Sequence, residues 1–150
     1  MCANADVVVS EPRLPRIAVF SRCDGGLRRR FGSYGHDDGQ FRFPGGLCFM
    51  SDDRHVVVAD ADKHRLSVFS IDGEFIRHVG VGVLNYPMGV AASAFDELVV
   101  ADRRNRRLRV FSSTGDLLAT VGDLCFTWVA VHGSTVFVTR SFSTNVSVFN

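Results

Sequence analysis

The sequence predicts an all-β protein built from antiparallel blades of a partial β-propeller, and two observations carry this prediction. The first is a repeat: residues 57–69 read VVADADKHRLSVF and residues 99–111 read VVADRRNRRLRVF, with eight identities 42 positions apart. The second is the pattern inside each copy, where β-branched apolar residues, a polar stretch and renewed apolar alternation are typical of two strands joined by a loop. A period of about 40 residues with several short strands indicates a propeller blade, which buries its faces by stacking on neighbours.

The first strands follow from alignment with that repeat. Residues 7–20 align with residues 56–69 without a gap, so the chain is expected to begin within a blade. An Asp-Gly-Gly turn at residues 24–26 favours a tight hairpin and leads into a returning strand at residues 27–31. A turn and a strand of the same kind close each later copy.

Long connections lead from the last strand of one repeat to the first strand of the next. They span residues 33–46 and 81–89, and both end in Pro, one residue and Gly, a turn predicted to deliver the chain into an inner strand. The following strand covers residues 55–59 in one copy and 98–101 in the other. No segment shows a 3.6-residue apolar period, so no helix is predicted.

These positions divide the chain into four predicted segments. They are a partial blade at residues 1–32, complete blades at 33–80 and 81–122, and a degenerate partial blade at 123–150, in which Thr139 replaces the aspartate of the repeat. The expected content is fourteen strands, or about three and a half four-stranded blades.

The landmark residues resemble the NHL repeat, named for its Asn-His-Leu signature, in which Asp-x-x-Asn-x-Arg-Ile/Leu follows an apolar strand. The matching residues of the first complete copy are Gly32, Gly39, Gln40, Phe41, Pro44, Gly46, Asp60, His64, Arg65, Phe69, Gly73 and Gly80, and those of the second are Pro87, Gly89, Asp102, Asn105, Arg107, Phe111, Gly115 and Gly122. The resemblance implies a six-bladed propeller. It also implies a relation to the substrate- or RNA-binding ends of ubiquitin ligases in the tripartite-motif and related families.

A closed six-bladed ring needs roughly 250 residues at this period, and the chain has 150. An open arc exposes sheet faces and blade edges to association. Three explanations remain open at this point: the chain is a fragment of a longer protein, it closes by pairing with another copy, or it forms a strained four-bladed ring. Self-association through the open edges is expected in the first two cases.

Composition favours a globular protein without a general attraction to polyanions. The formal net charge is +1, and Lys63 is the single lysine among 17 basic residues, so any electrostatic binding must be local. No apolar stretch reaches the roughly 18 residues of a membrane span, and the N-terminus lacks the basic-then-apolar order of a signal peptide. We therefore expect a cytoplasmic protein with no membrane partner. The four cysteines form no CxxC pair, which argues against a structural zinc site.

Five arginines fall within seven residues, at Arg103, Arg104, Arg106, Arg107 and Arg109. Such a cluster suits phosphates or acidic peptides when the side chains fan outward. However, the repeat signature pairs Asp60 with Arg65 and Asp102 with Arg107, and we expect these two pairs to be structural, tying neighbouring strands together. That interpretation leaves the first three arginines of the cluster for a partner.

Catalytic and metal sites are not predicted. The candidates for a metal are Asp60 with Asp62, and His36 with Asp37 and Asp38, but the glycine and glutamate of a calcium loop are missing. The inner strands read LCFM, VAAS and WVAV and offer no His, Asp or Glu. We expect no cofactor and no enzyme. A propeller hydrolase or lyase with a metal in the central channel is the alternative.

Connectivity predicts which face binds. Antiparallel strands that run outward from the axis send the long connections to one face and the tight Asp-Gly turns to the other. Long loops with Arg, His and aromatic residues suit recognition. The predicted function is therefore a recognition module for a protein, with RNA as the alternative partner, and the predicted contacts are Tyr34, His36, Phe41, Lys63, Tyr86, Arg103, Arg104 and Arg106.

Overall fold

The computed structural model describes residues 6–140 and 146–149. Within these residues the chain forms fourteen strands, one short 3₁₀ turn at Ala61–Lys63 and no α-helix. The strands are β1 (Asp6–Glu11), β2 (Arg16–Ser21), β3 (Leu27–Phe31), β4 (Pro44–Phe49), β5 (His55–Asp60), β6 (Arg65–Ser70), β7 (Phe75–Val79), β8 (Pro87–Ala92), β9 (Leu98–Asp102), β10 (Arg107–Phe111), β11 (Leu117–Val121), β12 (Phe126–His132), β13 (Thr135–Arg140) and β14 (Val146–Phe149). No helical segment of the described residues has the length and apolarity that crossing a bilayer requires.

The strands form four antiparallel sheets in which every strand pairs with its neighbours in sequence. We call them blade I (β1–β3), blade II (β4–β7), blade III (β8–β11) and blade IV (β12–β14). The two copies of the sequence repeat occupy matching places, since β5 pairs with β6 in blade II as β9 pairs with β10 in blade III. The prediction of an all-β protein with propeller blades is confirmed.

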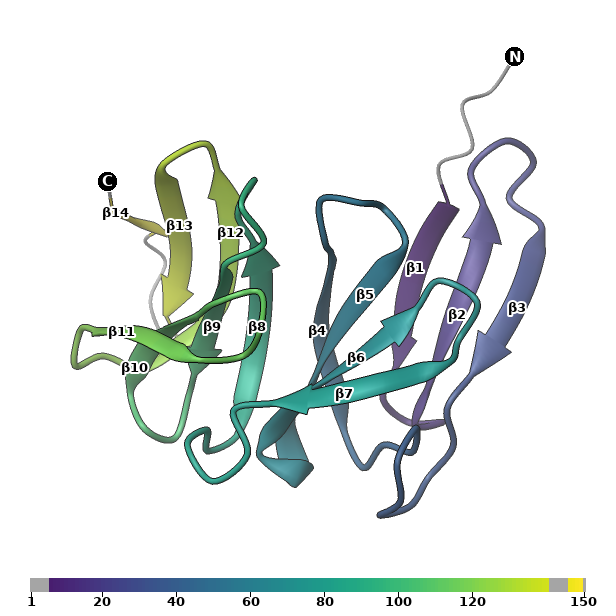
Figure 1. The fold of residues 1–150 in the computed structure, drawn as a ribbon, viewed down its shortest axis with the longest axis horizontal. Coiled ribbons are helices and arrows are strands. Elements are labelled where there is room, and N and C mark those ends of the chain that lie inside the picture. The colour runs from purple at the N-terminus through teal and green to yellow at the C-terminus, as the bar shows by residue number, and fades with distance from the viewer. Residues whose placement is uncertain (1–5, 141–145, 150) are drawn as a thin grey trace.

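The blades stand side by side in an open arc (Figure 1), with blades I and IV at its opposite ends. The described strands therefore do not close into a four-bladed ring. Blades II and III each have a neighbouring blade on both faces, whereas blades I and IV each have a neighbour on one face within the described residues.

The core lies between the blades, and β5 shows why the sequence runs apolar without interruption. Val56 and Val58 pack with Ile17 of β2 between blades I and II, whereas Val57 and Ala59 pack between blades II and III. All five residues are fully buried. Successive side chains of a strand point to opposite faces, so a strand covered on both faces needs apolar residues at every position. Burial of each valine contributes about 1.5 to 3 kcal/mol.

The inner strands of neighbouring blades approach closely at the Pro-x-Gly turn. A Cβ atom added at Gly46 would lie 2.6 Å from the carbonyl oxygen of Met88, and one added at Gly89 would lie 2.8 Å from the Cα atom of Trp128. Backbone atoms leave no room for a side chain at either position. The recurrence of this turn in the sequence therefore reflects contact between inner strands.

The two end faces of the arc differ in chemistry. On blade I, Arg28 pairs with Asp6 at 2.9 Å, and Glu11 pairs with Arg16 and with Arg30. On blade IV, the free face presents apolar side chains whose exposed fractions lie between 37% and 58%. They are Trp128, Phe137, Val146 and Val148. Blade I also exposes Val7, Val9 and Leu27. Its end of the arc thus combines ion pairs with apolar side chains, whereas the residues named on blade IV are apolar.

Strand connections gather on two faces, as the predicted connectivity requires. The loop face comprises residues 12–15, 32–43, 61–64, 80–86, 103–106 and 122–125. The turn face comprises residues 22–26, 50–54, 71–74, 93–97, 112–116 and 133–134. In Figure 1 the long connections run along the lower edge of the arc, and the hairpins β4–β5 and β12–β13 turn at the upper edge.

Candidate recognition surface

Two buried aspartates hold the long connections of the loop face. The carboxylate of Asp60 accepts hydrogen bonds from the backbone N–H of Phe43 at 2.9 Å and of Arg42 at 3.1 Å. The carboxylate of Asp102 accepts one from the backbone N–H of Asn85 at 2.7 Å. Both aspartates have no exposed surface. Each therefore fixes the point at which a connection enters the inner strand of its blade.

Burial raises the pKa of Asp60, because an ionised carboxylate is costly to desolvate. The hydrogen bonds from Phe43 and Arg42 act in the opposite direction and offset only part of the effect. Both copies of the repeat thus place an aspartate at a buried position. Burial is unfavourable for its charge, but its carboxylate there accepts the hydrogen bonds that hold the connection.

The predicted pairing of Asp102 with Arg107 is wrong. Arg107 is exposed, and the guanidinium that contacts Asp102 belongs to Arg109, with Nε at 3.2 Å. Asn105 also donates to this carboxylate, at 2.8 Å. Arg107 stands opposite Asp102 in the strand register, but the aspartate turns toward the connection instead.

The equivalent pair in blade II is not formed either. Asp60 faces Arg65 in the register, yet its carboxylate is occupied by backbone N–H groups, and Nε and Nη2 of Arg65 are buried without a hydrogen-bond partner among the described residues. A carboxylate–arginine pair at this place exists in blade I, where Glu11 pairs with Arg16. The longer glutamate side chain reaches across the strands.

Aromatic and arginine side chains meet in the middle of the loop face. The rings of Phe43 and Tyr86 are stacked, with centroids 6.4 Å apart and an interplanar angle of 24°. The guanidinium of Arg104 lies 4.4 Å from the centroid of the Tyr86 ring, and that of Arg103 lies 5.9 Å from it. Arginine over an aromatic face is stabilised by about 0.5 to 1 kcal/mol at an exposed site.

The backbone of Tyr86 is fixed in an uncommon conformation. Its φ angle is 58°, which non-glycine residues rarely adopt, and its N–H donates to Nδ1 of His64 at 3.0 Å. The N–H of Arg104 donates to the carbonyl oxygen of Asn85 at 3.1 Å. Because these contacts join loops from blades II and III, the ring and the arginine are held in place before any partner binds.

An apolar pocket adjoins this stack. It has a volume of about 440 Å³ and is lined by Glu11, Pro12, Arg13, Leu14 and Phe43. Phe43 belongs to both features, so the pocket and the stack form one continuous surface. We call the set Leu14, Phe43, Tyr86, Arg103 and Arg104 the recognition row.

A second pocket of about 550 Å³ lies between the connections of blades II and III. Its polar groups hold the loops: Nζ of Lys63 donates to the carbonyl oxygen of Gln40 at 2.9 Å, and Nδ2 of Asn105 donates to that of Val83 at 3.1 Å. Burial and the positive charge of Arg65 lower the pKa of Lys63. The residues that line this pocket mainly hold the connections of blades II and III in place.

The eight predicted contact residues differ in their exposure and in their contacts. The structure brings Tyr86, Arg103 and Arg104 together, and it places Tyr34 and His36 as exposed residues of the long connection. Arg106 is exposed and lies 3.9 Å from Asp123, whereas Lys63 supports a loop. Phe41 is wrong as a contact, because it is fully buried and packs on Phe69 with ring centroids 5.2 Å apart.

Sequence reasoning missed two members of the recognition row, Leu14 and Phe43. A signal for Phe43 exists: an aromatic residue precedes proline at Phe43–Pro44 and again at Tyr86–Pro87, 43 positions apart. Leu14 lacks such a signal, since its exposure at 57% and its place beside Phe43 depend on how blades I and II stack.

A hydrogen-bonded series of Ser67, His78 and Asp38 resembles a catalytic triad, but its serine is not accessible to a substrate. Oγ of Ser67 lies 3.1 Å from Nδ1 of His78, and Nε2 of His78 lies 2.9 Å from Asp38. Ser67 is 1% exposed, so no substrate reaches its hydroxyl. These hydrogen bonds instead link strand β6 and the outer strand β7 to the connection at residues 32–43. Among the described residues, no cluster of three or more His, Cys, Asp or Glu side chains could hold a metal ion.

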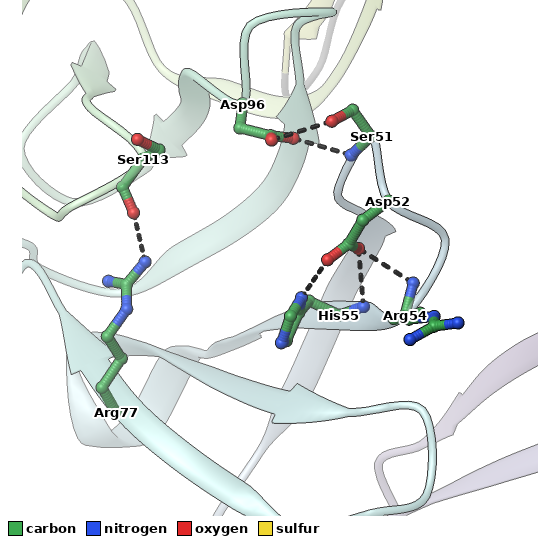
Figure 2. Close-up of polar contacts among 7 residues, drawn as sticks. All are labelled: Ser51, Asp52, Arg54, His55, Arg77, Asp96 and Ser113. Carbon is green, nitrogen blue, oxygen red and sulfur yellow. Dashed lines mark hydrogen bonds and ion pairs between the residues drawn. The ribbon is translucent and has the colours of Figure 1, made fainter.

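The turn face uses its polar groups to fasten neighbouring blades (Figure 2). Asp96 accepts hydrogen bonds from the backbone N–H and the hydroxyl of Ser51, at 2.6 and 2.8 Å. Arg77 donates to the carbonyl oxygen of Ser113. Asp52 instead accepts hydrogen bonds within its own turn, from the ring of His55 and the backbone N–H of Arg54. Asp96 and Arg77 therefore link blades II and III, and Asp52 stabilises the β4–β5 turn.

Solved structures with the same fold are β-propellers. Virginiamycin B lyase from Staphylococcus aureus matches 99% of this chain and 50% of its own, with a TM-score of 0.76 and 13% identity. A chain of the nidogen–laminin complex matches 97% of this chain and 55% of its own, with a TM-score of 0.78 and 18% identity. At these identities the likeness concerns the fold alone, and the chain spans about half of each structure.

Sequence comparisons identify the repeat. The family model of the NHL repeat matches residues 41–69. Protein brain tumor of Drosophila melanogaster is 28% identical over 89 residues, and RING finger protein nhl-1 of Caenorhabditis elegans is 35% identical over 83 residues. These segments cover 59% and 52% of this chain and 8% of each relative. Residues 41–69 therefore match an NHL repeat, and the chain is similar over about half of its length to two proteins that are many times longer than the matched segments.

Proposed function

We propose that this chain is a non-catalytic recognition module that binds a protein partner on its loop face. The observation that carries the proposal is the recognition row, in which the exposed Leu14 and Arg104 and the partly exposed Phe43, Tyr86 and Arg103 lie on loops fixed by buried aspartates. Tyrosine and arginine on a rigid scaffold are typical of the residues that dominate binding energy at protein interfaces. The turn face offers fewer groups for a partner, because polar side chains such as Asp96, Asp52 and Arg77 are already hydrogen-bonded within the chain.

The proposal extends to the context of the module. One relative is named a RING finger protein, and the matched segments are a small part of both relatives. We propose that the chain is a fragment of a longer cytoplasmic protein and acts there as the substrate-recognition part of a ubiquitin ligase. The apolar free face of blade IV supports this view, because a further blade would cover it.

RNA is the second candidate partner, and the exposed Arg104 and Arg106 with the partly exposed Arg103 favour it. The net charge of +1 and the exposed Asp37, Asp38 on the same face weaken it. A lyase activity, which the fold of virginiamycin B lyase brings to mind, lacks a candidate site in the described inner strands.

A capture comparison tests the proposal. The whole chain is immobilised beside a triple variant, Tyr86→Ala, Arg103→Ala and Arg104→Ala, and lysate proteins are quantified by mass spectrometry with and without ribonuclease. We expect a set of proteins that the triple variant loses and that ribonuclease leaves bound.

The matched control carries Arg22→Ala and Arg54→Ala, two exposed arginines of the turn face. Loss of the captured proteins with this control would mean that partners bind the turn face, which would contradict the proposal. Release of all of them by ribonuclease would make RNA the partner.

A further inference from the structure

We propose that the recognition row selects a peptide segment in which a carboxylate side chain lies next to an apolar one. This inference rests on the proposed function and names its partner class. The apolar side chain would enter the pocket beside Leu14 and Phe43, and the carboxylate would bind Arg103 and Arg104.

The charges along the row favour a carboxylate. Arg13 and Arg42 are exposed at the pocket end, and Arg104 is exposed at the other end. Glu11 is the acidic residue of the pocket wall, and its carboxylate pairs with Arg16 and Arg30. The neighbouring acidic residue is therefore neutralised, which leaves an excess of positive charge over the row.

The arginine at the end of the row opposite the pocket is prepared for such a ligand. Arg104 lies against the face of Tyr86, and its side chain makes no hydrogen bond or ion pair within the described residues. A guanidinium held over an aromatic ring keeps its in-plane N–H donors available, and these donors fit a carboxylate in a two-bonded geometry. Since the ring and the loop are already fixed, binding orders few side chains, which limits its entropic cost.

The pocket supplies the second requirement. Its lining by Pro12, Leu14 and Phe43 is mostly apolar, and its volume of about 440 Å³ accommodates a leucine or phenylalanine side chain. Leu14 is 57% exposed, so a partner side chain that covers it removes apolar surface from water. A partner without an apolar residue would leave this half of the row unused.

These features fit a protein segment better than RNA. A nucleic acid gains most from free aromatic faces for base stacking, but the ring of Tyr86 already contacts Phe43 and Arg104. The apolar pocket has no role toward phosphates. RNA is therefore an outcome that the experiment must distinguish.

The experiment selects random dodecapeptides displayed on phage against the immobilised whole chain. We expect enriched peptides to place Asp or Glu beside Leu, Ile, Met or Phe. A synthetic peptide of the enriched sequence is then measured by fluorescence polarisation. Arg103→Ala with Arg104→Ala should weaken binding about tenfold and reduce its salt dependence. Leu14→Ala should weaken binding about fivefold and leave the salt dependence unchanged.

Two controls are matched to these changes. Arg22→Ala with Arg54→Ala removes two turn-face arginines, and Phe95→Ala removes an apolar side chain that is 84% exposed on the turn face. Both variants should bind the peptide as the parent chain does. Equal unfolding midpoints for all variants show that the changes act on binding.

The outcomes separate this inference from the proposed function. Enriched peptides that lack acidic residues but depend on the recognition row would overturn the inference and leave the proposed function in place. Peptides that depend on the turn-face controls would overturn both. Failure to enrich any peptide would overturn the inference, while the capture comparison still decides the function. A labelled single-stranded RNA that binds more tightly than the peptide through Arg103 and Arg104 would also overturn it.

Discussion

Blades II and III share a sequence repeat and a strand register, but their aspartates have different partners. Asp60 of blade II accepts hydrogen bonds from backbone N–H groups of residues 42 and 43. Asp102 of blade III accepts one backbone N–H and two side chains, those of Asn105 and Arg109. The common element is thus the backbone of the incoming connection. The aspartate of the repeat holds the loop, and the side chains around it vary.

The third strand of each blade shows where the variation comes from. Ser67 and Arg109 occupy the same position, since each stands opposite a valine of the preceding strand, Val58 or Val100. The short serine reaches only His78 on the outer strand, whereas the long arginine reaches both Asp102 and Thr120. One substitution therefore decides whether the aspartate has a cationic partner.

The largest expected effect is the loss of Asp102. Asp102→Ala leaves the N–H of Asn85 and the half-buried guanidinium of Arg109 without a partner, and breaking a buried pair of this kind costs about 3 to 5 kcal/mol. Asp60→Ala leaves only backbone N–H groups unpaired and should cost about 1 to 3 kcal/mol. Urea unfolding followed by fluorescence of Trp128 measures both. Equal losses for the two variants would mean that the side-chain partners of Asp102 contribute nothing.

A second comparison concerns the two arginines of β10. Arg109→Ser converts blade III to the arrangement of blade II and removes a charge-assisted hydrogen bond, so the free energy of unfolding should fall by about 1.5 to 3 kcal/mol. Arg107→Ser changes an exposed residue and should alter it by about 0.5 kcal/mol or less. The reverse ranking in urea unfolding would restore the pairing of Asp102 with Arg107.

The junctions between inner strands provide a third comparison. Gly89→Ala places a methyl group against the backbone of Trp128, and overpacking of this kind costs about 1 to 3 kcal/mol. Gly82→Ala is the control for backbone entropy in a site with open space, although its positive φ adds strain of its own. Hydrogen exchange should show that Gly89→Ala lowers protection in β12 more than in β5. Uniform loss of protection would mean that the blades unfold as one unit.

Sequence reasoning reached the blades because a stacked blade demands apolar residues on both faces and a glycine at each inner contact. It also sorted the connections correctly, since alternation of strand direction fixes the face of each loop. It erred on Arg107, because register alone does not tell which way a side chain turns. It erred on Phe41, because a place in a loop does not tell whether a side chain is exposed. Asp102 turns toward the N–H of Asn85, and Phe41 fills the space between blades I and II. Both outcomes depend on loop paths that no pattern in the repeat encodes.

The smallest expected effect concerns pH and sets the buried Asp60 against the exposed Asp52. Burial raises the pKa of Asp60 above its ordinary value of 3.8, so over the range just above 3.8 the folded chain keeps a proton that the unfolded chain has lost. Its contribution to stability is therefore complete below pH 3.8 and declines as pH rises through the folded pKa. For Asp52, partial desolvation acts to raise the pKa, whereas the hydrogen bonds from Arg54 and His55 act to lower it. The hydrogen bonds have the larger combined effect, so the pKa of Asp52 is lowered.

For Asp52 the sign is reversed: its contribution is present above pH 3.8 and is lost as pH falls through the lower folded pKa. The measurement is the free energy of unfolding of the parent chain minus that of Asp60→Asn, and of the parent minus Asp52→Asn, as a function of pH. The first difference should decrease as pH rises from 3.8, and the second should decrease as pH falls below 3.8. Curves of the same sign would mean that Asp60 is stabilised as a carboxylate. In that case the two N–H groups at residues 42 and 43 outweigh its burial, and the aspartate of the repeat would stabilise the loop through its charge.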